Sequence, residues 1–458
     1  MPDPAMLWAP LAWTPTGWRE RVLLRIGGDG TWAEVAPDVT APPADALVLQ
    51  GPLLPGLVDA HSHAFQRAFA GRAERRDALT DDFWSWRDRM YRVALRISPS
   101  QLRAIAAQLY VELLKGGYTQ VCEFHYLQHD VDGKPYSDPL EMSWALADAA
   151  AETGIGLTLL PVLYERAGFA SALREDQRRF KASAEAVWQA ATEIAAIRRP
   201  LVNAGLAIHS LRAALPASIG ELRRHAEGSV GPIHIHVAEQ TAEVDECLQT
   251  TGSRPIEWLV KEGLLDARWQ LVHATHTVPS EIDAVASSGA GVVLCPSTEA
   301  NLGDGLADVR RWLAAGVPMT IGSDSQVTRD WREELRWLDY GQRLVLRQRN
   351  VSAAPQAGVP STAERLFDRV VEGGAAAAGE SAWGLVVGAR ADGLVVDAQE
   401  DALLGLPPGL TLDALLFSSP GQPWRDVMVA GRWVIRAHRH AHAESIAHRF
   451  AAAMHELA

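Results

Sequence analysis

The fold of this chain is decided by residues 56–66, which read GLVDAHSHAFQ. An apolar run that ends at Val58 leads into two histidines separated by one residue. On an extended strand, side chains at positions i and i+2 project from the same face, so His61 and His63 can face one point. Two neutral imidazoles that meet at the end of a strand suit a divalent metal such as zinc, although a chance pair of histidines in a loop gives the same pattern.

The composition limits the classes of protein that the chain can belong to. Its 458 residues, 48% of them hydrophobic and 22% charged, are enough for a barrel-sized domain and a smaller one. The formal net charge of -13 argues against nucleic acid or an anionic membrane as a partner, and an anionic small substrate requires a local cationic pocket. Three distant cysteines indicate no disulfide framework, and we see no signal peptide or membrane span. We therefore expect a reduced, cytoplasmic, soluble protein.

Downstream of the histidine pair, apolar segments of about six residues alternate with helical stretches, the pattern of parallel βα units. With the first strand they make eight strands, the number that closes a TIM-type (β/α)8 barrel. The later strands are predicted at 119–126, 156–164, 204–209, 232–238, 270–274, 291–295 and 319–322. Helices are predicted at 99–115, 139–153, 177–197, 215–227, 241–249, 254–262, 280–288, 305–315 and 361–371. The long segment 67–98 is interpreted as a lid or an inserted helix pair.

The two ends of the chain contain short strand patterns that lie outside this alternation. We predict a small, discontinuous β-sandwich-like domain from residues 1–55 and 381–440, with strands at 391–397 and 427–434. The metal-dependent barrel then occupies residues 56–380, and a C-terminal helix or tail occupies 441–458. Four histidines near this tail, at 438, 440, 442 and 448, are expected in a solvated, weakly ordered segment and not in a metal site.

Polar residues at the ends of later strands complete a candidate site, because active sites of this barrel lie at the carboxyl ends of the strands. His236 ends the fifth strand, His273 ends the sixth, and Asp324 follows the eighth, although an Asp there can also cap a helix. His234 lies deeper and is expected as a hydrogen-bonded core imidazole, and His276 is expected in a loop. Together with the first pair, these strand-end residues predict a metal site.

The lysines indicate one metal ion and not two. None of the four lysines lies at a predicted strand end, so a binuclear site bridged by a modified lysine is not expected; they are Lys115, Lys134, Lys181 and Lys261. A metal with three His and one Asp leaves room for a water whose pKa can fall to about 7. A nearby Glu and a further His can then move protons to a leaving nitrogen.

The order HxH on the first strand, HxxE on the fifth, His on the sixth and Asp on the eighth resembles the mononuclear deaminases of the amidohydrolase superfamily. The resemblance spans nearly the whole chain. Shorter runs are similar to the branch of that superfamily that hydrolyses the formimino C=N bond of N-formimino-L-glutamate, giving N-formyl-L-glutamate and ammonia in histidine degradation. These runs are HSHAFQRAFAG at 61–71, EFHY at 123–126, HSLR at 209–212, HVAEQ at 236–240 and LVHATH at 271–276.

The resemblance implies a role for each matching position. It implies one zinc or similar divalent ion, whose bound hydroxide attacks the formimino carbon, with the ligands His61, His63, His236 and Asp324. Asp324 is also implied to take a proton from the water, Glu239 to protonate the imino nitrogen, and His273 to orient the hydroxide. The residues implied to hold the two carboxylates of the substrate are Gln66, Arg87, Tyr126, His209 and Arg212. A homodimer is likewise expected from the resemblance alone.

Two alternatives stay open on the sequence. The first is a deaminase of the same scaffold that acts on a purine, pyrimidine or pterin ring, which requires an aromatic slot with amide-type groups and not two arginines. The second is a non-catalytic barrel protein. The loss of one or more metal-ligand residues would indicate such a protein. For Arg87 the alternative is an ordinary surface residue of the long loop. For Tyr126 the alternative is a packed aromatic at a strand end.

Overall fold

The centre of the molecule is a parallel barrel sheet, seen in a computed structural model that describes residues 4–76, 82–418 and 421–458. Its strands follow the order β16-β15-β14-β13-β12-β8-β7-β6, and β11 (Val202–Ala204) pairs with β8 beside this path. The strands are β6 (Leu57–Ser62), β7 (Tyr118–His125), β8 (Gly156–Leu163), β12 (Leu206–Ile208), β13 (Ile233–Val237), β14 (Trp269–His273), β15 (Gly291–Leu294) and β16 (Met319–Ile321). The later strands lie within two residues of their predicted positions.

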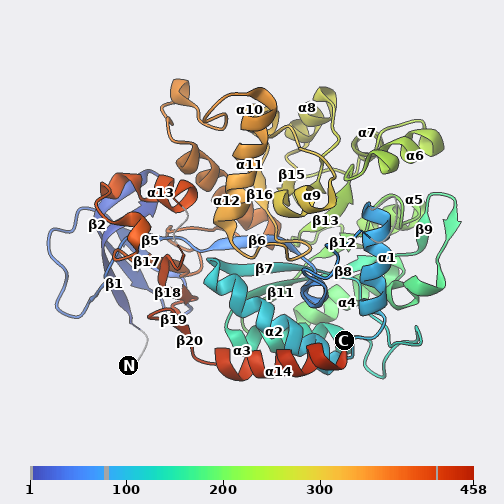
Figure 1. Ribbon diagram of the computed structural model, residues 1–458, viewed down its shortest axis with the longest axis horizontal. Helices are drawn as coiled ribbons and strands as arrows, with labels where there is room; N and C mark the ends of the chain where they lie inside the picture. Colours follow the sequence, from blue (N-terminus) through green and yellow to red (C-terminus); the bar gives the residue numbers. More distant parts are fainter. Residues whose placement is uncertain (1–3, 77–81, 419–420) are drawn as a thin grey trace.

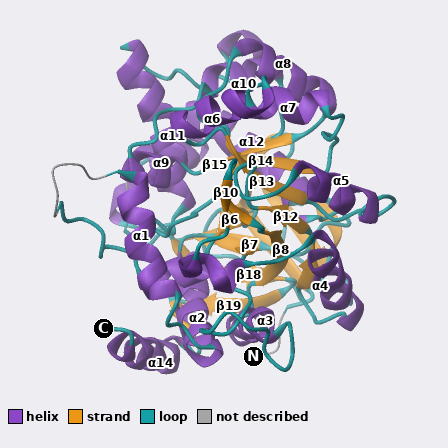
Figure 2. Ribbon diagram, turned by 90° about the vertical axis from the view of Figure 1, so that its right-hand side faces the viewer, coloured by secondary structure: helices purple, strands orange, loops and turns teal. Residues whose placement is uncertain are grey.

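The first and last strands of this sheet meet and nearly close it. A parallel bridge joins Ser62 to Asp324, and the Asp324 N–H donates to the His61 carbonyl at 2.9 Å. Helices surround the strands, as Figure 2 shows. The predicted TIM-type barrel is therefore confirmed, and its closure brings the end of β6 beside the residues that follow β16.

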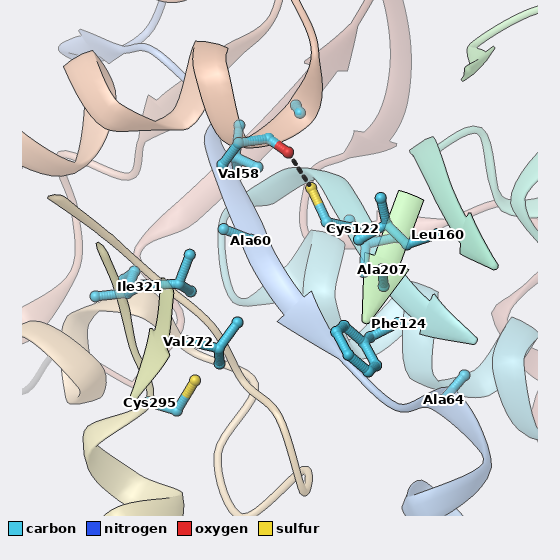
Figure 3. Packing of buried hydrophobic residues seen from close by; sticks show 14 of the residues in the cluster. Val58, Ala60, Ala64, Cys122, Phe124, Leu160, Ala207, Val272, Cys295 and Ile321 are labelled. Atoms are coloured by element: carbon cyan, nitrogen blue, oxygen red, sulfur yellow. Dashed lines mark hydrogen bonds between the residues drawn. The ribbon is translucent and has the colours of Figure 1, made fainter. Parts of the chain in front are cut away.

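Small and branched side chains fill the inside of the barrel. Figure 3 shows Val58 and Ala60 of β6 among side chains from other strands, including Val272 and Ile321, and all four are almost fully buried. Cys122 of β7 is also buried, and its thiol donates to the Ala377 carbonyl at 3.4 Å. Because packed side chains fill this interior, we expect the chemistry at a rim of the barrel.

Most predicted barrel helices are present, and two of them begin later than predicted. Those near their predicted bounds are α2 (Pro99–Lys115), α3 (Glu141–Thr153), α5 (Pro216–His225), α6 (Thr241–Thr251), α7 (Pro255–Lys261) and α8 (Pro279–Ser288). Helix α12 (Thr362–Ala378) begins as predicted but ends seven residues later than the predicted Val371. The segment predicted as helix 177–197 begins as a 3-10 turn, and α4 (Ala184–Ile197) starts only after Ser183, whose hydroxyl caps it. Likewise α10 (Val309–Ala315) starts after the cap Asp308 and not at residue 305.

Three further helices belong to segments where the sequence prediction was less definite. Helix α9 (Pro296–Leu302), which directly follows β15, was not predicted. Helix α11 (Trp331–Leu346) follows the loop after β16. In the segment 67–98, residues 77–81 lie outside the described part, and the described residues contain one helix, α1 (Phe83–Ala94), instead of a helix pair.

Both chain ends contribute to a second, mixed sheet, which lies beside the barrel in Figure 1. Its strands are β1 (Met6–Thr14), β2 (Gly17–Ile26), β3 (Trp32–Ala36), β4 (Leu47–Val48), β5 (Leu53–Leu54), β17 (Gly393–Val396), β18 (Trp424–Val429), β19 (Arg432–Arg436) and β20 (Arg439–His440). The predicted strand 427–434 is in fact a hairpin, because Ala430 and Gly431 both have positive φ and form the turn between β18 and β19. Helix α13 (Thr411–Phe417) lies between β17 and β18 in sequence.

The C-terminal segment is more ordered than predicted. His440 forms part of β20, is buried, and has its Nε2 2.9 Å from the Thr153 carbonyl, so the expected solvated tail is wrong at this residue. Helix α14 (Ala443–Glu456) then packs against α2, and Gln101 donates to Glu456 at 2.8 Å. In the described part of the chain, no helix is both long and apolar enough to cross a membrane.

Candidate active site

Four side chains converge where β6, β13 and β16 end at one rim of the barrel. His61 Nε2 lies 2.9 Å from His236 Nε2 and 3.4 Å from Asp324 Oδ1, and His63 Nε2 is also 3.4 Å from Asp324 Oδ1. All four side chains are almost fully buried. The structure therefore brings together the four residues that the resemblance implies as metal ligands.

The hydrogen bonds of the histidines indicate which ring nitrogens face the cluster with a free lone pair. His63 Nδ1 lies 2.9 Å from the Phe124 carbonyl, and His236 Nδ1 lies 2.8 Å from the His209 carbonyl. A carbonyl oxygen only accepts, so each Nδ1 must carry the proton, which leaves the Nε2 lone pair for the cluster.

Burial supplies the protonation states that a metal requires. It lowers the pKa of His61 to about 3 and also lowers the pKa values of His63 and His236, so these rings stay neutral. Burial alone would raise the pKa of Asp324, but the neighbouring imidazoles outweigh it and the net pKa is lowered. Three neutral imidazoles and one carboxylate are a donor set that fits zinc or a similar divalent ion.

Residues with left-handed backbone conformation surround this cluster. Ala238, His273 and Asp324 have φ values of 54°, 69° and 46°. Such conformations cost of order 1–3 kcal/mol for residues with a side chain, and the surrounding structure must hold them in place. Each lies at or just after the end of a barrel strand, where the chain turns away from the sheet.

A buried carboxylate that sequence reasoning missed positions the loop containing Asp324. Asp59 of β6 accepts from the Ser323 N–H at 2.8 Å and from the Ser323 hydroxyl at 2.6 Å, and both residues have no exposed surface. The Gln326 amide donates to the Asp324 carbonyl and to the Ser62 hydroxyl, each at 3.0 Å. An acidic residue within an apolar strand was the only sequence signal for this contact.

A second set of residues lies beside the four-residue cluster. His273 Nε2 is 3.7 Å from Glu239 Oε1 and 3.8 Å from Asp324 Oδ2, and its Nδ1 is 3.4 Å from Glu299 Oε1. Burial lowers the pKa of His273, but the three carboxylates outweigh it and raise the pKa above its usual value. Burial raises the pKa of Glu239. Glu299 lies on the unpredicted helix α9, and it was missed for that reason.

The cluster opens into a pocket at this rim of the barrel. The five residues predicted to hold the substrate carboxylates all line it: Gln66, Arg87, Tyr126, His209 and Arg212. The pocket also has aromatic walls that sequence reasoning did not assign, formed by Phe83, Trp86, Tyr91 and Tyr164. The signal available for three of them was the aromatic-rich composition of the segment 67–98.

The neutral polar side chains that line the pocket contact one another. The Gln66 amide donates to the Tyr126 hydroxyl at 3.3 Å. The His209 ring lies 4.5 Å from the Tyr164 ring, and burial lowers its pKa well below the usual value. The Tyr126 ring packs with its centre 5.1 Å from that of Phe180, and the residue also lines the pocket. Its role in holding a substrate carboxylate stays a prediction.

The two arginines are largely removed from solvent. The side chain of Arg212 is 6% exposed, and its Nε lies 4.0 Å from the buried carboxylate of Glu243. The side chain of Arg87 is 13% exposed, so it is not the ordinary surface residue of the alternative interpretation. Among the described residues, neither Nε has a hydrogen-bond partner. Two guanidinium groups with N–H donors that have no protein partner in the described part of the chain therefore line the pocket. They supply a local positive charge in a protein of net charge -13, and guanidiniums bind carboxylates.

Two other strand-associated histidines lie outside this cluster, as expected. His234 is buried with its Nε2 2.9 Å from the Ala377 carbonyl of α12. His276 lies after β14 with its Nε2 2.8 Å from the Asp304 carbonyl. Both rings are used in structural hydrogen bonds.

Comparisons with known proteins agree on one family. The amidohydrolase family matches residues 53–434 of the chain. The formimidoylglutamate deiminase of Pseudomonas aeruginosa is 46% identical over 456 residues, which cover 98% of this chain and 99% of that protein. The crystal structure of an amidohydrolase from Brucella melitensis is 40% identical with a TM-score of 0.92 and covers 99% of both chains. An adenosine deaminase from Xanthomonas campestris with bound zinc shares the fold, at 22% identity and a TM-score of 0.80, covering 100% of this chain and 99% of that one.

Proposed function

Because the chain belongs to the amidohydrolase family, we propose that it acts as a formimidoylglutamate deiminase. It hydrolyses the formimino C=N bond of N-formimino-L-glutamate to N-formyl-L-glutamate and ammonia, a step of histidine degradation. The observation that carries this proposal is a single pocket with a histidine–carboxylate cluster and two largely buried arginines. A linear dianion whose reacting carbon lies near the cluster would place its two negative charges beside these two arginines.

The cluster is proposed to hold one zinc or similar divalent ion. The ligands would be Nε2 of His61, His63 and His236 with the carboxylate of Asp324, since these atoms face one another and the lone pairs of His63 and His236 are directed to the cluster. When bound, such an ion supplies an acidified water as nucleophile at neutral pH. A homodimer and a cytoplasmic location stay predictions.

Three residues of this chain are proposed to move and direct protons. Asp324, whose pKa is lowered, is ionised and can accept the proton of the attacking water on Oδ2. Glu239, whose pKa is raised by burial, can hold a proton at neutral pH and donate it from its carboxyl to the leaving nitrogen. His273 lies between these two carboxylates, so its Nε2 is placed to orient the water.

Product analysis tests the proposed reaction directly. Water added to the formimino carbon gives a centre with two nitrogens, and the one that receives the proton leaves. Protonation by Glu239 of the terminal nitrogen gives ammonia and N-formyl-L-glutamate in equal amounts. We expect this pair when the purified protein acts on N-formimino-L-glutamate and the products are quantified by NMR. Formamide and glutamate, or no turnover by the metal-loaded protein, would contradict the proposal.

Arg212→Met is expected to lower kcat/KM for N-formimino-L-glutamate by roughly ten- to a hundred-fold. A charge-assisted hydrogen bond contributes roughly 1.5–3 kcal/mol, and Met keeps the apolar stem of the side chain but offers no donor. Steady-state kinetics and metal analysis measure the effect, and the metal content should not change. Arg369→Met on α12 is a matched control, because Arg369 pairs with Glu372 away from the pocket. Equal kinetics for the Arg212 variant and the parent would remove Arg212 from substrate binding.

A further inference from the structure

Trp84 contacts both pocket arginines, although sequence reasoning assigned it no role. The guanidinium carbon of Arg87 lies 4.6 Å from the centre of the Trp84 ring, and that of Arg212 lies 5.6 Å from it. Arg87 is three residues further along α1, on the same face of the helix. Arg212 comes from the loop after β12, so the indole joins α1 to the rim of the barrel.

Further contacts hold Arg87 and Trp84 in place. Arg87 also lies over the ring of Tyr91 at 5.5 Å, and the Tyr91 hydroxyl is 3.3 Å from the Tyr164 hydroxyl. Trp84 lies in the first turn of α1, where its backbone N–H donates to the capping carboxylate of Asp82 at 3.0 Å. A guanidinium held over ring faces keeps its in-plane N–H donors for other partners.

Trp84 lies on the outer side of the arginine pair. The active-site pocket is lined by both arginines but not by Trp84, whereas a second hollow of about 900 Å³ is lined by all three residues. This outer hollow also includes residues 167–171 and polar side chains of α6, namely Glu246, Gln249 and Thr250. The guanidiniums therefore separate the active site from the outer hollow, and the indole covers them on the outer side.

We propose that Trp84 is a positioning residue that determines specificity for dicarboxylates. The indole lies against both guanidiniums and so fixes the spacing between those of Arg87 and Arg212. Because two fixed and largely buried cations require two anions at matching positions, this arrangement selects a substrate with two carboxylates over one with a single carboxylate. This inference rests on the proposed function, since it assigns the two arginines to the two carboxylates of one substrate.

Trp84→Leu is expected to reduce the preference for two carboxylates by roughly tenfold, the scale of two cation–π contacts at partly exposed sites. The preference is the ratio of kcat/KM for N-formimino-L-glutamate to that for N-formimino-4-aminobutyrate, which lacks the α-carboxylate. The change should fall mainly on KM for the dianion, with kcat and metal content close to the parent values. Trp84→Phe, which keeps an aromatic face and the packing of α1, should give an intermediate ratio. Trp337→Leu on α11, where Trp337 is 39% exposed, is the control and should leave the ratio unchanged.

A binding measurement separates this inference from the proposed reaction. Calorimetry with glutarate and butyrate requires no turnover, and Trp84→Leu should weaken glutarate binding roughly tenfold while butyrate binding stays the same. If the parent protein does not deiminate N-formimino-L-glutamate but shows this Trp84-dependent preference for glutarate, the reaction is wrong and the role of Trp84 holds. An unchanged ratio in both Trp84 variants, or an equal loss for one and two carboxylates, would overturn the inference.

Discussion

Glu239→Gln is expected to retain its metal and to lose about 10²–10⁴-fold in kcat, the usual contribution of a positioned general acid. The amide has nearly the same shape as the carboxyl group but has no acidic proton to transfer to the leaving nitrogen. Glu239 lies 3.7 Å from His273, outside the set of four proposed ligands, so the metal content should stay at one equivalent. Single-turnover kinetics and elemental analysis of the same preparation measure both quantities.

The control for this variant is Glu257→Gln on α7, an exposed carboxylate paired with Lys261. It should match the parent in kcat. If Glu239→Gln turned over at the parent rate, another acid would have to protonate the leaving nitrogen. A Glu239→Gln protein that had lost its metal would instead place Glu239 among the groups that hold the ion.

His236→Ala is expected to lose both the metal and all measurable turnover. Removal of one of four ligands opens the site, and the remaining imidazoles cannot close around the ion. Elemental analysis should give one equivalent for the parent and much less than one for the variant. Two equivalents in the active parent protein would contradict the proposal of a single ion.

His234→Ala, two residues earlier on β13, is the matched control. Its ring is buried and bonded to the Ala377 carbonyl, so its removal should cost about 1–3 kcal/mol of stability through the unsatisfied carbonyl. It should keep the full metal content, because its side chain does not reach the cluster. A comparison of thermal unfolding with metal analysis distinguishes the two effects, and metal loss in both variants would mean that the metal depends on general packing of β13.

The barrel and the positions of the site residues could be predicted because they follow local rules. Apolar runs of fixed length alternate with helical periodicity, and closure of the barrel then brings distant strand ends together without further information. For that reason His61 and Asp324, separated by most of the chain, were expected at one rim. The strand bounds were accurate within two residues because each run is limited by polar or glycine residues.

The remaining features depend on contacts that local patterns do not contain. The role of Asp59 comes from Ser323, which lies 264 residues away in sequence. Helix α9 spans only seven residues, the first of which is Pro296, too few for a helical period to be seen. The strand predicted at 427–434 is apolar on both sides of Ala430–Gly431, and the turn there is set by positive φ values and not by a change in hydrophobicity. Trp84 required knowledge of where Arg212 lies relative to α1.

The most direct test of the dicarboxylate pocket compares kcat/KM for several compounds at one pH and one ionic strength. These compounds are N-formimino-L-glutamate, its uncharged diamide, guanine and cytosine. A guanidinium left without its carboxylate in a dry pocket is costly, so the diamide and both nucleobases should react poorly or not at all, while N-formimino-L-glutamate should react well. Equal rates for the diamide, or faster turnover of a nucleobase, would contradict the dicarboxylate pocket and favour a ring deaminase.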